Sequence, residues 1–162
     1  MAWTTGAPLS ATRAASSATP PFAALPTAPG MARGYVQAAL AGWRLGEFAD
    51  VAELISSELV ANAVAASASV PGSIGALVIR VCLITDGNVL TIEVWDQAPG
   101  VPVLLEADRF AESGRGLGII NTLTGGAWGC QPAVGQPGKC VWAQIRLRDE
   151  ADRKFQEWQE IR

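Results

Sequence analysis

The sequence contains no histidine among its 162 residues, and this absence removes several kinds of chemistry at once. Without an imidazole, these residues supply no histidine general base, no Ser-His-Asp triad, no phosphohistidine relay and no histidine-ligated metal site. Cysteine is scarce as well: Cys82, Cys130 and Cys140 lack the C-x-x-C spacing of a zinc site, and an odd number suits a reducing compartment. Cys130 and Cys140 are candidates for neighbouring strands, where buried free thiols are the simpler interpretation.

An excess of positive charge and long apolar runs are also missing. The net charge is −3, and Lys and Arg are scattered, so nothing indicates nucleic acid or an anionic membrane as a partner. No run approaches the roughly 18 consecutive apolar residues of a membrane span. Residues 1–30 show no basic segment followed by an apolar core, as a signal peptide would. We therefore expect a cytoplasmic protein without a membrane partner.

The residues that are present suffice for one domain. Hydrophobic side chains make up 49% of the chain and charged ones 17%, which is enough apolar material for a core and too little charge for disorder. Residues 1–20 are rich in Ala, Ser, Thr and Pro, and we expect them to form a disordered tail. We place the folded domain at 21–148 and a charged, amphipathic helix or tail at 149–162.

Hydrophobic periodicity predicts helices first and mainly strands afterwards. The expected elements are an extended piece at 22–26, helices at 31–43, 50–67 and 118–123, and strands at 76–84, 89–95, 126–131 and 140–147. Residues 85–88, between the first two strands, have the composition of a hairpin turn. This order predicts an α+β fold, a two-layer sandwich whose mostly antiparallel mixed sheet carries helices on one face.

Two short motifs contain polar side chains that are suited to catalysis or to ligand binding. Glu58 and Asn62 stand four residues apart on the second predicted helix, so they share a face. A carboxylate there can polarise a hydroxyl, and an amide oxygen can ligate Mg²⁺. Asp96, at a strand end, can accept a hydrogen bond from an exocyclic amine, and Gly100 lets the backbone turn close to a ligand. A solvent-facing helix surface and an ordinary turn are the alternatives.

The third motif is a glycine series, Gly114, Gly116 and Gly118, at the start of the third predicted helix. Glycines ahead of a helix expose backbone N–H groups at its positive end, which is a natural phosphate site, and a flexible loop is the alternative. The spacing does not match the Rossmann fingerprint. Gly138-Lys139 does not complete a Walker loop either, because Cys140 follows where Ser or Thr is needed.

Taken in order, the three motifs resemble those of the GHKL, or Bergerat-fold, ATPase superfamily, which includes histidine kinases, gyrase and anti-sigma-factor serine kinases. The N box is similar to Glu58-Leu-Val-Ala-Asn62, the first glycine box to Asp96-Gln-Ala-Pro-Gly100, and the second to Gly114-Arg-Gly-Leu-Gly118. Residues 53–64, 112–118 and 138–142 look like parts of small actinobacterial ATP-binding regulators of the anti-sigma serine/threonine kinase type. The resemblance covers residues 22–147 and implies a Bergerat fold.

The resemblance also implies roles for individual residues, with ATP and Mg²⁺ as cofactors. Asn62 would ligate Mg²⁺, Glu58 would be the general base, and Asp96 would hold the adenine amino group above a pocket floor shaped by Gly100. Residues 101–113 would form the ATP lid. The residues that would bind the nucleotide at the helix start are Gly114, Arg115, Gly116, Leu117 and Gly118.

Two positions depart from the family pattern. Ala98 stands where the first glycine box usually has glycine, and Cys140 stands where Ser or Thr commonly follows Gly-Lys, which is expected to leave a weak thiol near the adenine. The first hypothesis is a serine/threonine kinase that acts on a sigma factor or an anti-sigma-factor antagonist in transcription regulation. The alternatives are a catalytically degenerate nucleotide-binding or partner-sequestering module, and a detached sensor-kinase catalytic domain. Family members often dimerise, so a homodimer is compatible with the resemblance.

Overall fold

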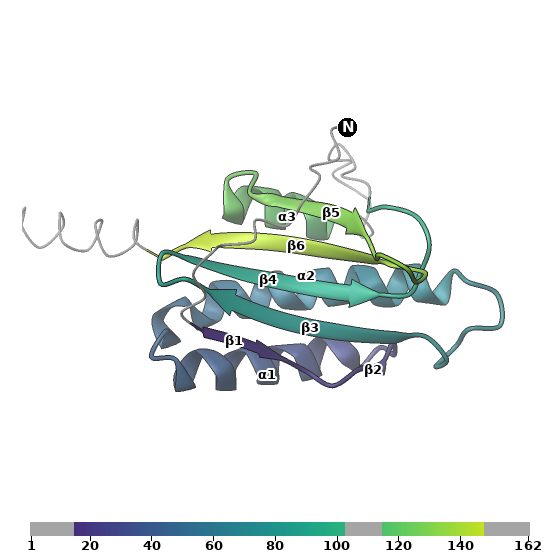
Figure 1. The fold of residues 1–162 in the computed structure, drawn as a ribbon, viewed down its shortest axis with the longest axis horizontal. Helices are drawn as coiled ribbons and strands as arrows, with labels where there is room; N and C mark the ends of the chain where they lie inside the picture. Colours follow the sequence, from purple (N-terminus) through teal and green to yellow (C-terminus); the bar gives the residue numbers. More distant parts are fainter. Residues whose placement is uncertain (1–14, 103–114, 148–162) are drawn as a thin grey trace, which may run out of the picture.

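The computed structural model describes residues 15–102 and 115–147. The elements in chain order are β1 (Ala15–Ala18), β2 (Phe22–Ala23), α1 (Ala28–Gly42), a 3₁₀ turn η1 (Gly46–Phe48), α2 (Ala49–Ala68), β3 (Val78–Thr85), β4 (Val89–Asp96), α3 (Arg115–Thr124), β5 (Trp128–Pro132) and β6 (Lys139–Arg146). The strands form one sheet in the order β1-β3-β4-β6-β5, and β2 also pairs with β3 (Figure 1).

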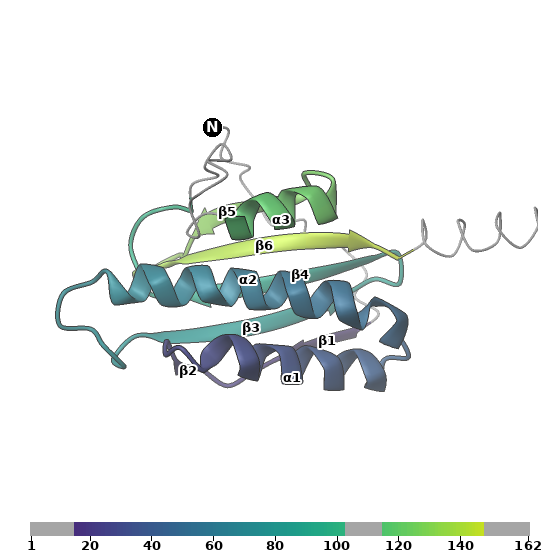
Figure 2. The same cartoon turned by 180° about the vertical axis from the view of Figure 1, so that it is seen from behind.

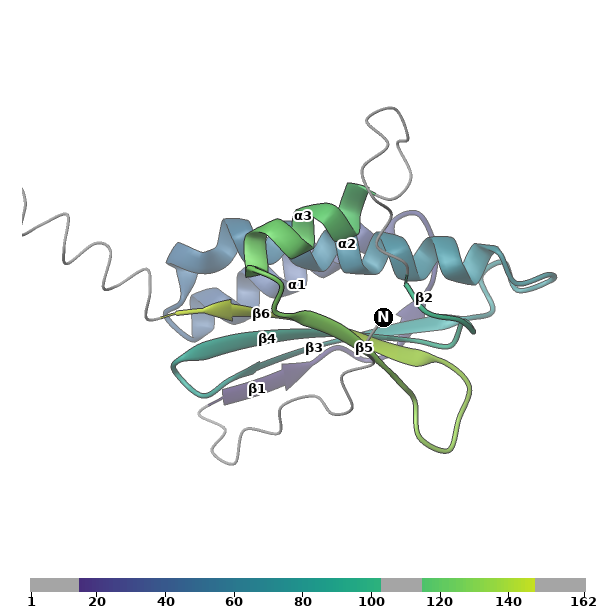
Figure 3. The ribbon, with the colours of Figure 1, turned by 90° about the horizontal axis from the view of Figure 1, so that it is seen from above.

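The helices cover a single face of this sheet. Seen from behind, α1, α2 and α3 all lie in front of the strands (Figure 2), and the view from above shows them as one layer over the sheet (Figure 3). Every pairing between the described strands is antiparallel, so the predicted mixed sheet has no parallel pair in this part of the chain. The predicted α+β sandwich with helices on one face is confirmed.

Strand register decides which side chains face the helices. Along β4, Leu90, Ile92 and Val94 are fully buried in the core beneath the helices. Because side chains alternate along a strand, Asp96 belongs to this same series, and its cross-strand partners Ile79 and Lys139 share its face. The side chains at the intervening positions face away from the helices. The Asp96 carboxylate, at the end of β4, therefore lies on the face of the sheet that the helices cover.

The central helix α2 forms the middle of the core. Its fully buried Ile55 and Val60 pack in the same cluster as the sheet residues, and Val36 and Leu40 of the neighbouring α1 complete that cluster. Each such side chain contributes about 1.5–3 kcal/mol when fully buried. This packing orients α2 and leaves Glu58 and Asn62 only partly buried.

The segment Gly46–Ala68 is long and apolar enough to cross a membrane by length and composition, although polar residues interrupt it throughout. The core helix of a folded domain passes the same test. Here 44% of the apolar window is buried inside the structure, and Ile55, Leu59 and Val60 are in the core. Burial against the sheet accounts for this stretch without a membrane.

The predicted disordered tail at 1–20 is wrong for its last part, because Ala15–Ala18 forms β1. This strand pairs with β3 from Ala15↔Thr85 to Ala18↔Cys82, and Tyr35 of α1 donates a hydrogen bond from its hydroxyl to Ser17 Oγ at 2.7 Å. Alanine and serine have little strand preference of their own, so the open edge of β3 orders this segment. The remaining tail residues, 1–14 and 149–162, lie outside the described residues.

Both α1 and α3 begin three residues earlier than predicted. Pro29 lies in the first turn of α1, where proline is tolerated because the first N–H groups of a helix have no partner within the helix. The start of α3 at Arg115 places Gly116 and Gly118 inside the helix rather than in a loop ahead of it. Gly114 and the predicted lid residues from 103 onward lie outside the described residues.

Candidate functional site

The N-box side chains meet the glycine series where α2 passes the start of α3. A Cβ built on Gly116 would lie 2.5 Å from Glu58 Oε2 and 3.6 Å from Asn62 Oδ1. These two oxygens therefore face the backbone of the first turn of α3, and a side chain at position 116 would displace Glu58 Oε2. The positive end of a helix attracts anions, so a carboxylate, an amide and a helix start converge in one place.

Asn62 has an unsatisfied group in this cluster. Its Nδ2 is buried and has no hydrogen-bond partner, whereas buried amides are nearly always paired. Its side-chain oxygen is a suitable Mg²⁺ ligand, and Mg²⁺ usually takes only one or two protein ligands beside water and substrate phosphates. Within residues 15–102 and 115–147, no cluster of three His, Cys, Asp or Glu side chains would hold a metal alone. The residues present fit a magnesium ion that is shared with phosphate groups.

Asp96 lies at the other end of the site, in a buried ion pair with Lys139. The Lys139 Nζ donates to Asp96 Oδ1 at 2.9 Å, and the two side chains are 7% and 1% exposed. Lys139 Nζ also donates to the carbonyl oxygen of Ala98 at 3.1 Å, and the Ala98 N–H donates to the same Asp96 Oδ1 at 2.8 Å. All contacts to this carboxylate fall on a single oxygen.

The second carboxylate oxygen, Asp96 Oδ2, is buried and has no hydrogen-bond partner. Burial raises the pKa of Asp96, while the hydrogen bond and charge of Lys139 and the backbone N–H of Ala98 lower it; the net direction is upward. An unpaired buried acceptor costs about 1–3 kcal/mol. A ligand that donates a hydrogen bond, such as the exocyclic amine of adenine, would satisfy this oxygen. The base end of the site therefore also fits the nucleotide.

Two glycines shape the backbone around Asp96. Gly138, directly before β6, has φ +113°, and a Cβ there would overlap the Asp96 carbonyl oxygen and approach Gln97. Gly100 has φ +90° and is exposed, and a Cβ added there would meet nothing within 4 Å, so its contribution is the turn after β4 rather than close packing. Ala98 is fully buried. Its N–H donates to Asp96, and its carbonyl oxygen accepts from Lys139, so its backbone contacts both members of the ion pair.

The remaining residues of the second glycine box contribute unequally. Leu117 is 4% exposed and packs in the hydrophobic core, so its side chain is turned away from solvent. Arg115 is exposed at the start of α3, and Gly118 is half-buried with open space around it. Gly116 lies against the N-box side chains, and the structure does not test the predicted nucleotide contacts of the others.

The expectation that Cys140 lies near the adenine is wrong. Cys140 is the cross-strand partner of Trp95, so its thiol belongs to the sheet face away from the helices, opposite to Asp96 and Lys139. Cys130 is on the neighbouring β5, as expected, but pairs with Val141. All three cysteines are free, and burial raises the pKa of each thiol.

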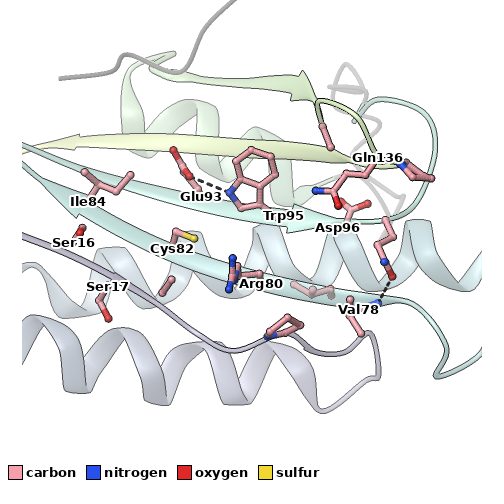
Figure 4. A pocket seen from close by; sticks show the side chains of 16 residues that line it. Ser16, Ser17, Val78, Arg80, Cys82, Ile84, Glu93, Trp95, Asp96 and Gln136 are labelled. Atoms are coloured by element: carbon pink, nitrogen blue, oxygen red, sulfur yellow. Dashed lines mark hydrogen bonds between the residues drawn. The ribbon is translucent and has the colours of Figure 1, made fainter. Parts of the chain in front are cut away.

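The structure has a groove of about 760 Å³, but it lies on the open face of the sheet. Arg80, Cys82, Glu93 and Trp95 line it, and the Trp95 indole N–H donates to Glu93 Oε2 at 3.0 Å (Figure 4). Asp96 also lines this groove, whereas Glu58, Asn62 and Gly116 do not. The candidate site is placed on the helix-covered face, because Glu58 and Asn62 meet Gly116 there and the register of β4 directs the Asp96 side chain to the same face.

Sequence reasoning missed Lys139. In the sequence, Gly138-Lys139 appears as an incomplete Walker loop and as part of the family-like stretch 138–142, but the lysine receives no role. The signal that would have found that role is strand pairing. Asp96 ends one strand and Lys139 begins another, so antiparallel pairing of β4 with β6 sets them opposite each other.

The chain matches a known protein family over most of its length. The family model for the histidine kinase-like ATPase domain matches residues 22–145, which include α1 through β6 except for the last residue of that strand. A search of curated proteins gives no match.

Proposed function

Because the chain belongs to the histidine kinase-like ATPase family, we propose that it binds ATP with Mg²⁺ and phosphorylates serine or threonine on a partner protein. The observation that carries this proposal is the convergence of Glu58 and Asn62 on Gly116. A general base, a magnesium ligand and a helix start in one cluster are what phosphoryl transfer requires, since it depends on positioning and charge neutralisation.

Each residue has a distinct task in this proposal. Bound ATP would supply the phosphoryl group, and Mg²⁺ would neutralise its charge. Asn62 holds the metal through its amide oxygen, and Glu58 accepts the proton of the attacking hydroxyl. Asp96 accepts a hydrogen bond from the adenine amine, which satisfies its unpaired Oδ2.

We further propose that the partner is a sigma factor or an anti-sigma-factor antagonist, so that the protein regulates transcription in the cytoplasm. The alternative is a degenerate module that binds nucleotide or partner without transfer. One observation favours this alternative: Ala98 stands where the family usually has glycine.

Thermal unfolding with Mg²⁺-ATP tests the binding step. Ligand at about one hundred times Kd should add about 2.7 kcal/mol of stability, or roughly 5–10 °C in melting temperature. In Asn62→Ala the shift should lose its dependence on Mg²⁺, because the metal ligand is gone. A parent protein that shows no shift at millimolar nucleotide would contradict nucleotide binding.

Glu58→Gln tests the transfer step. The variant keeps the shape of the side chain but cannot accept a proton, so we expect the parent's thermal shift and a loss of about 10²–10⁴ in phosphorylation rate. The assay is transfer of radiolabelled phosphate from ATP to the sigma factors and antagonists of the same organism. Binding without transfer in the parent would favour the degenerate module.

A further inference from the structure

In the ion pair between Asp96 and Lys139, one carboxylate oxygen has hydrogen-bond partners and the other has none. Asp96 Oδ1 accepts from both Lys139 Nζ and the Ala98 N–H, whereas Oδ2 is buried without a partner. The ammonium has three N–H groups, and Asp96 Oδ1 and the Ala98 carbonyl oxygen account for two of them. One further acceptor for the ammonium and one donor for Oδ2 would complete the hydrogen bonding of the pair.

Such an arrangement is costly for a purely structural ion pair. Burying two charges is repaid only when their remaining hydrogen-bonding capacity is satisfied, and here the carboxylate side chain is 1% exposed with one oxygen unsatisfied. Three contacts nevertheless hold this carboxylate and ammonium in a single orientation. The unsatisfied oxygen is therefore kept in a defined position rather than free to rotate towards the lysine.

We propose that Lys139 is a positioning residue for nucleotide recognition: it clamps Asp96 through Oδ1 and so presents Oδ2 as the acceptor for the exocyclic amine of the base. This proposal rests on the proposed function. The same ammonium lowers the pKa of Asp96 and so opposes the upward shift that burial causes, because a positive charge at 2.9 Å favours the ionised carboxyl. Lys139 acts through Asp96 and takes no part in phosphoryl transfer.

The other titratable groups that interact with Asp96 in the described structure are thiols. Cys130 of β5 and Cys140 of β6 both have pKa values raised by burial, so they remain neutral near pH 7. Lys139 is thus the cation that opposes the upward pKa shift of Asp96. Without Lys139, only the backbone N–H of Ala98 still opposes the effect of burial, so the carboxyl takes up a proton at higher pH than in the parent.

The test compares the parent with Lys139→Met by calorimetric titration with Mg²⁺-ATP and with the purine riboside triphosphate that lacks the exocyclic amine. In the parent, loss of the amine should weaken binding about tenfold or more, because a hydrogen bond to a charged group is lost. In Lys139→Met this ratio should fall at acid pH, where the carboxyl takes up a proton. ATP affinity of the variant should then recover as the pH rises, while that of the parent stays more nearly level.

A merely structural role for Lys139 predicts a different result. The variant would then be less stable but would retain the parent's ratio between the two nucleotides and its level pH profile, and that outcome overturns the proposal. If Lys139→Met does not fold, Lys139→Gln keeps a donor without the charge and should show the same pH dependence. A parent that binds neither nucleotide would overturn the proposed function as well, which distinguishes the two failures.

Discussion

Glu58 of α2 lies against Gly116 in the first turn of α3, so closely that a Cβ at position 116 would come within 2.5 Å of its Oε2. The contact joins the candidate general base to the backbone of the candidate phosphate site. It also explains why glycine occupies a helical position where alanine would favour the helix. Glycine at position 116 is therefore explained by the neighbouring Glu58 side chain and not by the needs of the helix.

Gly116→Ala should therefore separate stability from activity. Alanine favours a helix interior by about 1 kcal/mol over glycine, and the atom in its way is the end of a flexible side chain. We expect unfolding free energy within about 1 kcal/mol of the parent, measured in urea, and phosphorylation at least about tenfold slower because Glu58 is displaced. Gly34→Ala in α1 is the matched control, since nothing lies within 4 Å of its Cβ. Equal transfer rates in Gly116→Ala and the parent would contradict this role.

Gly138→Ala should destabilise the base end of the site. The added Cβ would overlap the Asp96 carbonyl oxygen, and φ +113° is strained for alanine, so we expect a loss of about 3 kcal/mol in urea unfolding. Gly135→Ala in the same loop is the control, because its φ is +73° but its surroundings are open; backbone strain alone predicts about 1 kcal/mol. Similar losses in both variants would show that the contact with Asp96 does not matter.

Tyr35→Phe tests the attachment of β1. The Tyr35 hydroxyl donates to Ser17 Oγ, so its removal should cost about 1 kcal/mol at pH 7. Burial raises the pKa of Tyr35 in the folded protein. Above pH 10 the unfolded phenol therefore ionises before the folded one, and the parent loses stability that the variant keeps. Urea titrations at about pH 7 and about pH 10.5 should show the difference between the two proteins shrinking; a constant difference would contradict the prediction.

Much of the fold follows from local patterns in the chain. The apolar series Ile55, Leu59 and Val60 predicts α2 within one residue at each end, since helical periodicity requires only neighbouring residues. The hairpin between β3 and β4 is equally local. Gly87 has φ +87°, and Asp86 Oδ1 accepts from the N–H groups of Asn88 and Val89.

Contacts between distant segments decided the rest. β1 forms because the edge of β3 offers unpaired backbone groups, and the composition of Ala15–Ala18 carries little sign of it. The motif pattern predicts Cys140 near the base, but the register of β6 against β4 sends its thiol to the open face. A shift of one residue in register exchanges the two faces of a strand, and no local pattern specifies that register.

The sequence by itself determined the three motifs, their order and the residue types that suit a nucleotide. Only the tertiary structure brought Glu58 and Asn62 to Gly116 and paired Asp96 with Lys139, because each contact joins elements that the chain order separates. The chemistry of a side chain is a local property, whereas its partner depends on how the sheet is paired and how the helices pack upon it.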